Sequence, residues 1–148
     1  MQKEVDREML RHLIATIVMR GRVAMTDVPD NFSAFRVEGT RSSGELLAHI
    51  GDLLEGSFYL MKGEMVYLNS DPLPWKEAVA RFLSAAKKLD DLIASDAILH
   101  QPIIKLVQGP IADALTHIGQ IIMLRRISGS PTTPKGYFSE DLILGEFY

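Results

Sequence analysis

The sequence predicts an all-α protein, a four-helix bundle, and three observations support this prediction. Four long segments repeat apolar residues at the three-and-four spacing that gives a helix one apolar stripe. Turn residues separate these segments, and no strand pattern stands out apart from an ambiguous stretch at 141–144. The 148 residues, 47% of them hydrophobic and 24% charged, suit one core, so we expect a single domain over 1–148.

The first helix is expected over about residues 3–25. Its apolar stripe consists of Leu10, Leu13, Ile14, Ile17 and Val18. Asp27, Pro29 and Asn31 mark its end and open a long connection to Arg41. A connection of this length can join non-adjacent helices of a bundle, so we expect the helices to run up-down-down-up.

The second helix begins at a capping box. Ser42 and Glu45 form an S-x-x-E pattern, in which each side chain accepts a hydrogen bond from a backbone N–H at the helix start. Apolar positions continue to about residue 67 and cover more than one stripe. We therefore expect a central helix with neighbours on two sides.

Prolines precede both remaining helices. Pro74 suits the start of the third helix, expected over about 75–93. Residues 97–109 are less regular and are interpreted as a short apolar connection. Pro110 is then expected to start the fourth helix, over about 111–127.

Basic residues and an apolar tail follow at the end of the fourth helix. Arg125 and Arg126 could bind an anionic substrate, but basic residues in a last turn also interact favourably with the helix dipole, which is the preferred interpretation. The tail at 132–148 contains Tyr137, Phe138, Leu142, Ile143, Phe147 and Tyr148. It is expected to pack on the body or on a partner. Together with Gly119, a helix-interior glycine that suggests close approach of another helix or chain, the tail indicates a homodimer.

Composition and charge exclude several classes of function. The formal net charge of −3 gives no general attraction to nucleic acid. The absence of cysteine excludes disulfides, thiolate nucleophiles and cysteine-based zinc sites. No apolar run approaches the roughly 20 residues needed to span a bilayer, and no Gly-rich phosphate loop indicates nucleotide binding. The first residues show no isolated apolar core of a signal peptide, so a cytoplasmic location is expected.

The four histidines are the candidate chemical groups. His12 and His100 have no partner at a spacing that suggests a site. Asp113 precedes His117 by four residues, so both side chains project from one helix face and can reach one ion. His49 lies among apolar residues of the second helix and needs a partner from a facing helix. On spacing alone, however, an Asp/His pair is more often a surface hydrogen bond and a single buried histidine more often a satisfied core residue.

A longer motif surrounds His117. Segment 114–126 reads ALTHIGQIIMLRR, and it resembles the H-x-G-Q…L-R segment of the last helix in DinB-like proteins. The order of helices over most of the chain also agrees with that family. In DinB-like proteins a histidine of the second helix and an H-x-x-x-H pair of the last helix bind a divalent metal. His49 and His117 match the first and third of these positions, whereas Asp113 stands where the family has histidine.

The resemblance implies a metal-dependent enzyme. His49, Asp113 and His117 would hold a divalent metal, zinc or nickel, with positions left open for water or substrate. The relatives imply a thiol-dependent transferase or a hydrolase that acts on a small molecule such as a low-molecular-weight thiol. No separate general base is evident, and Asp52, one turn after His49, is a weak candidate. The alternative is a non-catalytic bundle that binds a small ligand or forms a dimeric scaffold, with a degenerate metal site.

Overall fold

The computed structural model describes residues 1–147 and confirms the all-α fold. Within these residues the chain forms helices and loops, and 141–144 contain no strand. The last helix has three consecutive parts: α4, a π-helical segment at Val107–Ile111, and α5. The helices are α1 (Gln2–Met25), α2 (Ser43–Met61), α3 (Trp75–Ala94), α4 (Ile103–Leu106) and α5 (Ala112–Ile127).

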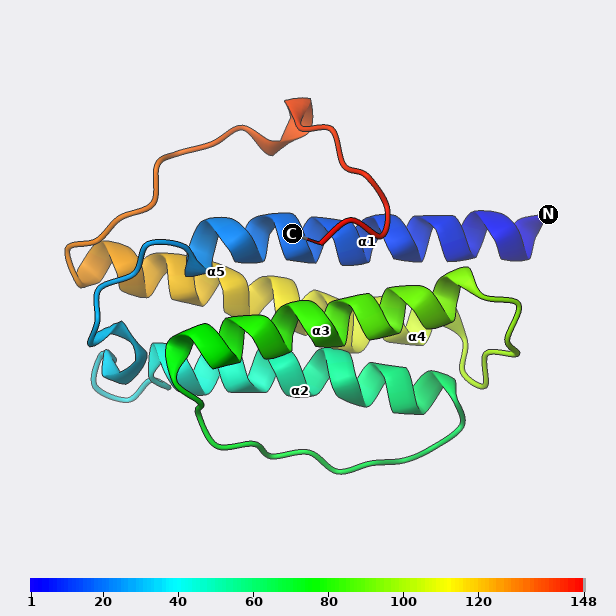
Figure 1. Ribbon diagram of the computed structural model, residues 1–148, viewed down its shortest axis with the longest axis horizontal. Coiled ribbons are helices and arrows are strands. Elements are labelled where there is room, and N and C mark those ends of the chain that lie inside the picture. The colour runs from blue at the N-terminus through cyan, green and yellow to red at the C-terminus, as the bar shows by residue number, and fades with distance from the viewer. Residues whose placement is uncertain (148) are drawn as a thin grey trace.

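The helices form a bundle in which α1 and α2 lie diagonally opposite. Helix α1 packs mainly on α3 and α5, and α2 packs on the same two helices. In Figure 1, α1 runs from right to left, α2 and α3 both run from left to right, and α5 returns to the left. The connection at 62–74 passes along the bundle, so that α3 begins at the same end as α2.

Helix α2 begins where the sequence predicts but ends six residues earlier than expected, at Met61 rather than at 67. The Ser42 hydroxyl accepts the backbone N–H of Glu45 at 3.1 Å, which confirms the N-cap. At the other end Gly63 adopts a φ of +84°. The N–H groups of Gly63 and Glu64 donate to the carbonyls of Leu60 and Tyr59, which is a Schellman motif.

The last helix passes through Pro110, so the expected helix start at this residue is wrong. The helix begins after Pro102, which occupies the N-cap of α4. Proline has no N–H and crowds the preceding turn of an α-helix. The π-helical segment accommodates it, since the N–H of Ala112 donates to the carbonyl five residues earlier, at Val107.

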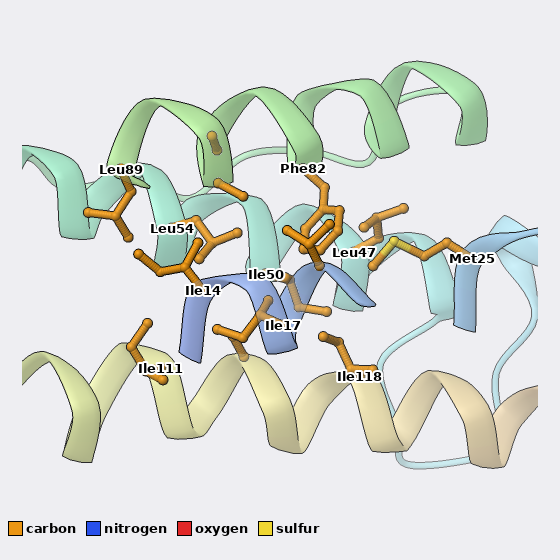
Figure 2. Close-up of a cluster of buried hydrophobic side chains, with 14 of the residues drawn as sticks. Ile14, Ile17, Met25, Leu47, Ile50, Leu54, Phe82, Leu89, Ile111 and Ile118 are labelled. Carbon is orange, nitrogen blue, oxygen red and sulfur yellow. The ribbon is translucent and has the colours of Figure 1, made fainter. Parts of the chain in front are cut away.

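The core is one continuous apolar cluster between the helices (Figure 2). The largest fully buried side chains come from all sides of the bundle and include Ile14, Ile17, Leu47, Ile50, Leu54, Phe82, Leu89 and Ile111. Gly21 allows α1 to approach α3, because a Cβ at this position would lie 2.6 Å from Cζ of Phe82.

Arg125 ties the last helix to the end of α1. Its side chain is almost completely buried, with 5% of the residue exposed. The guanidinium donates to the carbonyls of Thr26, Ala24 and Val23 at 2.8, 3.2 and 3.3 Å. It therefore satisfies carbonyls at the C-terminus of α1, which have no partner within that helix. Arg125 lies in the last turn of α5, as expected, and the contact with α1 is a further role that the sequence did not indicate.

The tail contacts the body at a buried ion pair. Asp90 is fully buried and accepts two hydrogen bonds from Arg11, at 2.9 and 3.0 Å. Gly145 of the tail lies directly over this pair with a φ of +81°, and a Cβ there would lie 3.1 Å from Nη2 of Arg11. Phe147 is buried in the core cluster, whereas Phe138 is fully exposed. Tyr148 lies outside the described residues.

Candidate functional site

The structure brings His49 and His117 together. His49 lies on α2 and His117 on α5, and these helices pack against each other. The two imidazole centroids are 4.9 Å apart and the rings are inclined at 74°. Both residues are half-buried. The prediction that these two side chains meet between facing helices is therefore confirmed.

A hydrogen bond orients the ring of His117. Its Nδ1 lies 2.8 Å from Oε1 of Gln120, one helical turn further along α5. Because an amide oxygen only accepts hydrogen bonds, Nδ1 carries the proton in this contact. In the neutral ring this leaves the lone pair on Nε2, which is the form that binds metals. The role of Gln120 was not expected from the sequence, although its spacing from His117 was a usable signal.

The surroundings of His49 favour its neutral form. Burial lowers the pKa of its imidazole, and the charge of Arg41 and the proximity of His117 lower it further. The carboxylates of Asp52 and Asp113 act in the opposite direction but do not outweigh these effects. His49 is therefore held as a neutral ring, which can act as a metal ligand near neutral pH.

Asp113 is near the two histidines but does not join them. It is exposed, and within residues 1–147 its carboxylate makes no ion pair or side-chain hydrogen bond. In the same part of the chain no group of three His, Asp or Glu side chains is close enough to hold a metal ion. Two imidazoles thus fit part of a ligand set, and the carboxylate expected to be the third ligand stands apart from them.

Asp52 is poorly suited to act as a general base. Ser70 donates to its carboxylate through the backbone N–H at 2.8 Å and through the hydroxyl at 2.7 Å, and Arg81 donates at 2.6 Å. Burial alone would raise the pKa of Asp52, but the hydrogen bonds from Ser70 and Arg81 outweigh it and lower the pKa. A carboxylate so strongly held in its charged form links α2 to α3 and is a weak proton acceptor.

The lowered pKa of Asp52 predicts a contribution to stability that depends on pH. Because the pKa in the folded protein lies below that in the unfolded chain, this stabilisation is present above the unfolded pKa and is lost as the pH falls through the folded pKa. Asp52→Asn is expected to cost about 1–3 kcal/mol at neutral pH and to make the loss of stability on acidification shallower. Urea midpoints measured from neutral pH to about pH 3 would show this.

The matched control is Asp30→Asn, which changes an exposed carboxylate that has no ion pair within the described residues. Its profile should follow that of the parent. Identical profiles for the parent and Asp52→Asn would show that Asp52 does not set the acid limb.

A cleft opens beside His117. Its volume is about 660 Å³, within the range of small-molecule sites. It is lined by the segment before α2 and by α5, through Val37, Gly39, Thr40, Arg41, Leu46, Thr116, His117, Gly119, Gln120, Met123, Leu124 and Ile127. A Cβ built on Gly119 would meet nothing within 4 Å. Among residues 1–147, the close contact expected at Gly119 is therefore absent, and the glycine widens the cleft instead.

Comparison with known proteins identifies no relative of this chain. No family model, no curated protein and no solved structure matches the chain. The resemblance to DinB-like proteins therefore stays an expectation from the sequence. Of the helices that the structure describes, none has the length and apolar character required to cross a membrane.

Proposed function

We propose that His49 and His117 bind one divalent metal ion, zinc or nickel, in a metal-dependent enzyme of the DinB-like kind, and that Asp113 is the third ligand. The observation that carries this proposal is the approach of the two imidazoles, 4.9 Å between centroids, from two different helices. Histidine nitrogen and carboxylate oxygen are ligands that suit these ions.

Three further features support the proposal. Burial and neighbouring charge favour neutral His49, and Gln120 orients His117 so that Nε2 is available. Asp113 lies one turn before His117 on the same helix and acts on His49 electrostatically. The chain direction in Figure 1 supports the up-down-down-up order expected from the long first connection.

The proposed chemistry is that of an open metal site. A divalent ion lowers the pKa of a bound water or thiol and so supplies a nucleophile near neutral pH. A small molecule, with a low-molecular-weight thiol as the candidate, would enter from the cleft that His117 lines. The protein's own groups position the site, since Gln120 holds the His117 ring.

The alternative is a non-catalytic bundle that binds a small ligand. The observation that favours it is the exposed position of Asp113, which leaves two histidines without a third ligand in the described part of the chain. The homodimer expected from the sequence stays a prediction under either function.

Thermal melts with and without zinc test the metal site. A metal that binds only the folded state stabilises it according to its concentration over its dissociation constant. At a free zinc concentration about 100-fold above that constant, the parent should gain roughly 5–10 °C in Tm. His117→Ala should abolish this gain, Asp113→Ala should reduce it severely, and Asp113→His should retain or increase it. Calorimetric titration near neutral pH would give the affinities.

His12→Ala is the matched control, because His12 is an exposed histidine of α1. Its zinc response should equal that of the parent. If Asp113→Ala and the parent respond equally, Asp113 is not a ligand. If none of the proteins responds to zinc or nickel, the non-catalytic alternative is the better account.

A further inference from the structure

The cleft beside His117 has both polar and apolar lining. The polar lining comes from the segment before α2 and from α5, and consists of Thr40, Arg41, Thr116, His117 and Gln120. The remaining walls are apolar and consist of Val37, Leu46, Met123, Leu124 and Ile127. A ligand that fits this cleft therefore has a polar head and an apolar body.

Arg41 gives the lining of the cleft a positive charge. It makes no ion pair or side-chain hydrogen bond with any residue in 1–147. Arg36 and Arg126 are also exposed and unpaired among the described residues, but they do not line the cleft. No Asp or Glu is among the residues that line the cleft. A guanidinium at the mouth of an apolar cleft suits a carboxylate, which it can bind through two parallel hydrogen bonds.

The apolar lining on α5 is open to solvent. Met123 and Ile127 are 58% and 55% exposed, although they follow one another along the face of α5 that lines the cleft. Gly119 lies on the same face with open space above it. Glycine inside a helix is unfavourable relative to alanine, so the presence of Gly119 lowers the stability of the helix. These three positions form a floor on which an apolar body can lie.

We infer that this cleft binds a small amphipathic monocarboxylate, with its carboxylate at Arg41 and its apolar body over Gly119, Met123 and Ile127. The inference rests on the proposed function in one respect, because a ligand bound in this cleft would lie beside the metal proposed at His117. The volume of about 660 Å³ suits a small molecule rather than a folded partner.

Octanoate, octanol and octylammonium are the probes, because they share an eight-carbon chain and differ in the charge of the head group. Binding to the full chain would be measured by calorimetry, first with EDTA present and then with zinc. Octanoate is expected to bind about tenfold more tightly than octylammonium, with octanol between them. Arg41→Gln should remove this preference and leave the binding of octanol unchanged.

Two variants make the test specific. Arg36→Gln removes another exposed arginine, which is not part of the cleft, and should keep the preference for octanoate. Gly119→Leu fills open space and should weaken octanoate and octanol alike by about tenfold or more, while circular dichroism shows an intact fold.

Three results would overturn the inference: no octanoate binding up to about 10 mM, equal binding of octanoate and octylammonium, or an unchanged preference in Arg41→Gln. Its failure is separate from that of the metal site. Octanoate binding in EDTA without any zinc response would contradict the metal proposal and leave the cleft assigned. A zinc response without octanoate binding would contradict the proposed carboxylate site and support the metal proposal.

Discussion

Arg125→Met is expected to destabilise the protein by about 3–5 kcal/mol, one of the two largest single effects that the structure predicts. Methionine keeps an unbranched apolar stem but is shorter and has no donors. The carbonyls of Val23, Ala24 and Thr26, which accept hydrogen bonds from Arg125, would lose their partner at the end of α1. A buried carbonyl that loses its donor retains its full desolvation cost. The loss is large because the hydrogen bonds of a charged guanidinium are stronger than those of neutral donors.

Denaturation in urea, followed by circular dichroism, would measure this loss. Arg126→Met is the matched control, since Arg126 is the exposed neighbour and its side chain makes no hydrogen bond or ion pair within residues 1–147. It should leave the midpoint almost unchanged. Arg125→Lys should give a midpoint between those of the two methionine variants. A single ammonium cannot replace all of the donors that the planar guanidinium presents. Equal midpoints for Arg125→Met and Arg126→Met would show that the cap contributes nothing.

Asp90→Ala should cost a similar amount, about 3–5 kcal/mol, because it removes one partner of a buried ion pair. Asp90 is completely buried and holds both donating nitrogens of Arg11. The guanidinium of Arg11 remains charged when the carboxylate is removed, because the ordinary pKa of arginine lies far above neutral pH. The change would also loosen the tail at Gly145, which lies over the pair. Urea midpoints, together with the rate of limited proteolysis in 132–147, report both effects.

Asp91→Ala is the control for this prediction. Asp91 is exposed and pairs with Lys87 on the surface of α3, an arrangement that contributes about 0.5 kcal/mol. The double variant Arg11→Met with Asp90→Ala should be less destabilised than the sum of the single changes, since it leaves no charge unpaired. Additive losses would contradict a direct interaction between the two side chains.

The sequence predicted the helices well where the signal was local. The three-and-four spacing located α1 and α3 to within a residue or two, and the Ser42 cap located the start of α2. It misjudged the end of α2 because Met65 and Tyr67 continue the apolar pattern, yet Tyr67 is 88% exposed. Gly63 was the better signal, since a left-handed residue ends a helix whatever follows it. The helix start expected at Pro110 was wrong, because a π-helical turn can accommodate a proline that an α-helix cannot.

The candidate site was predictable only in part, for a physical reason. His49 and His117 are far apart in the chain, and their pairing was expected from a resemblance and not from spacing. The surroundings of each ring depend on packing, which a single sequence does not show. Arg41 lies in an irregular segment where no periodicity indicates its neighbours. Asp113 shares a helix with His117, but sharing a helix face does not bring its carboxylate to the imidazoles.

The diagonal position of α1 and α2 has a consequence for the order of folding. Helices that follow one another in the chain normally pack first, because closing a short loop costs little entropy. Here α1 makes few contacts with α2 and packs on α3 and α5, which follow much later. As the chain leaves the ribosome, the apolar stripe of α1 therefore has no native surface to cover it until α3 has emerged. During that interval the uncovered apolar stripe of α1 is prone to aggregation. The earliest native contact between long helices forms between α2 and α3.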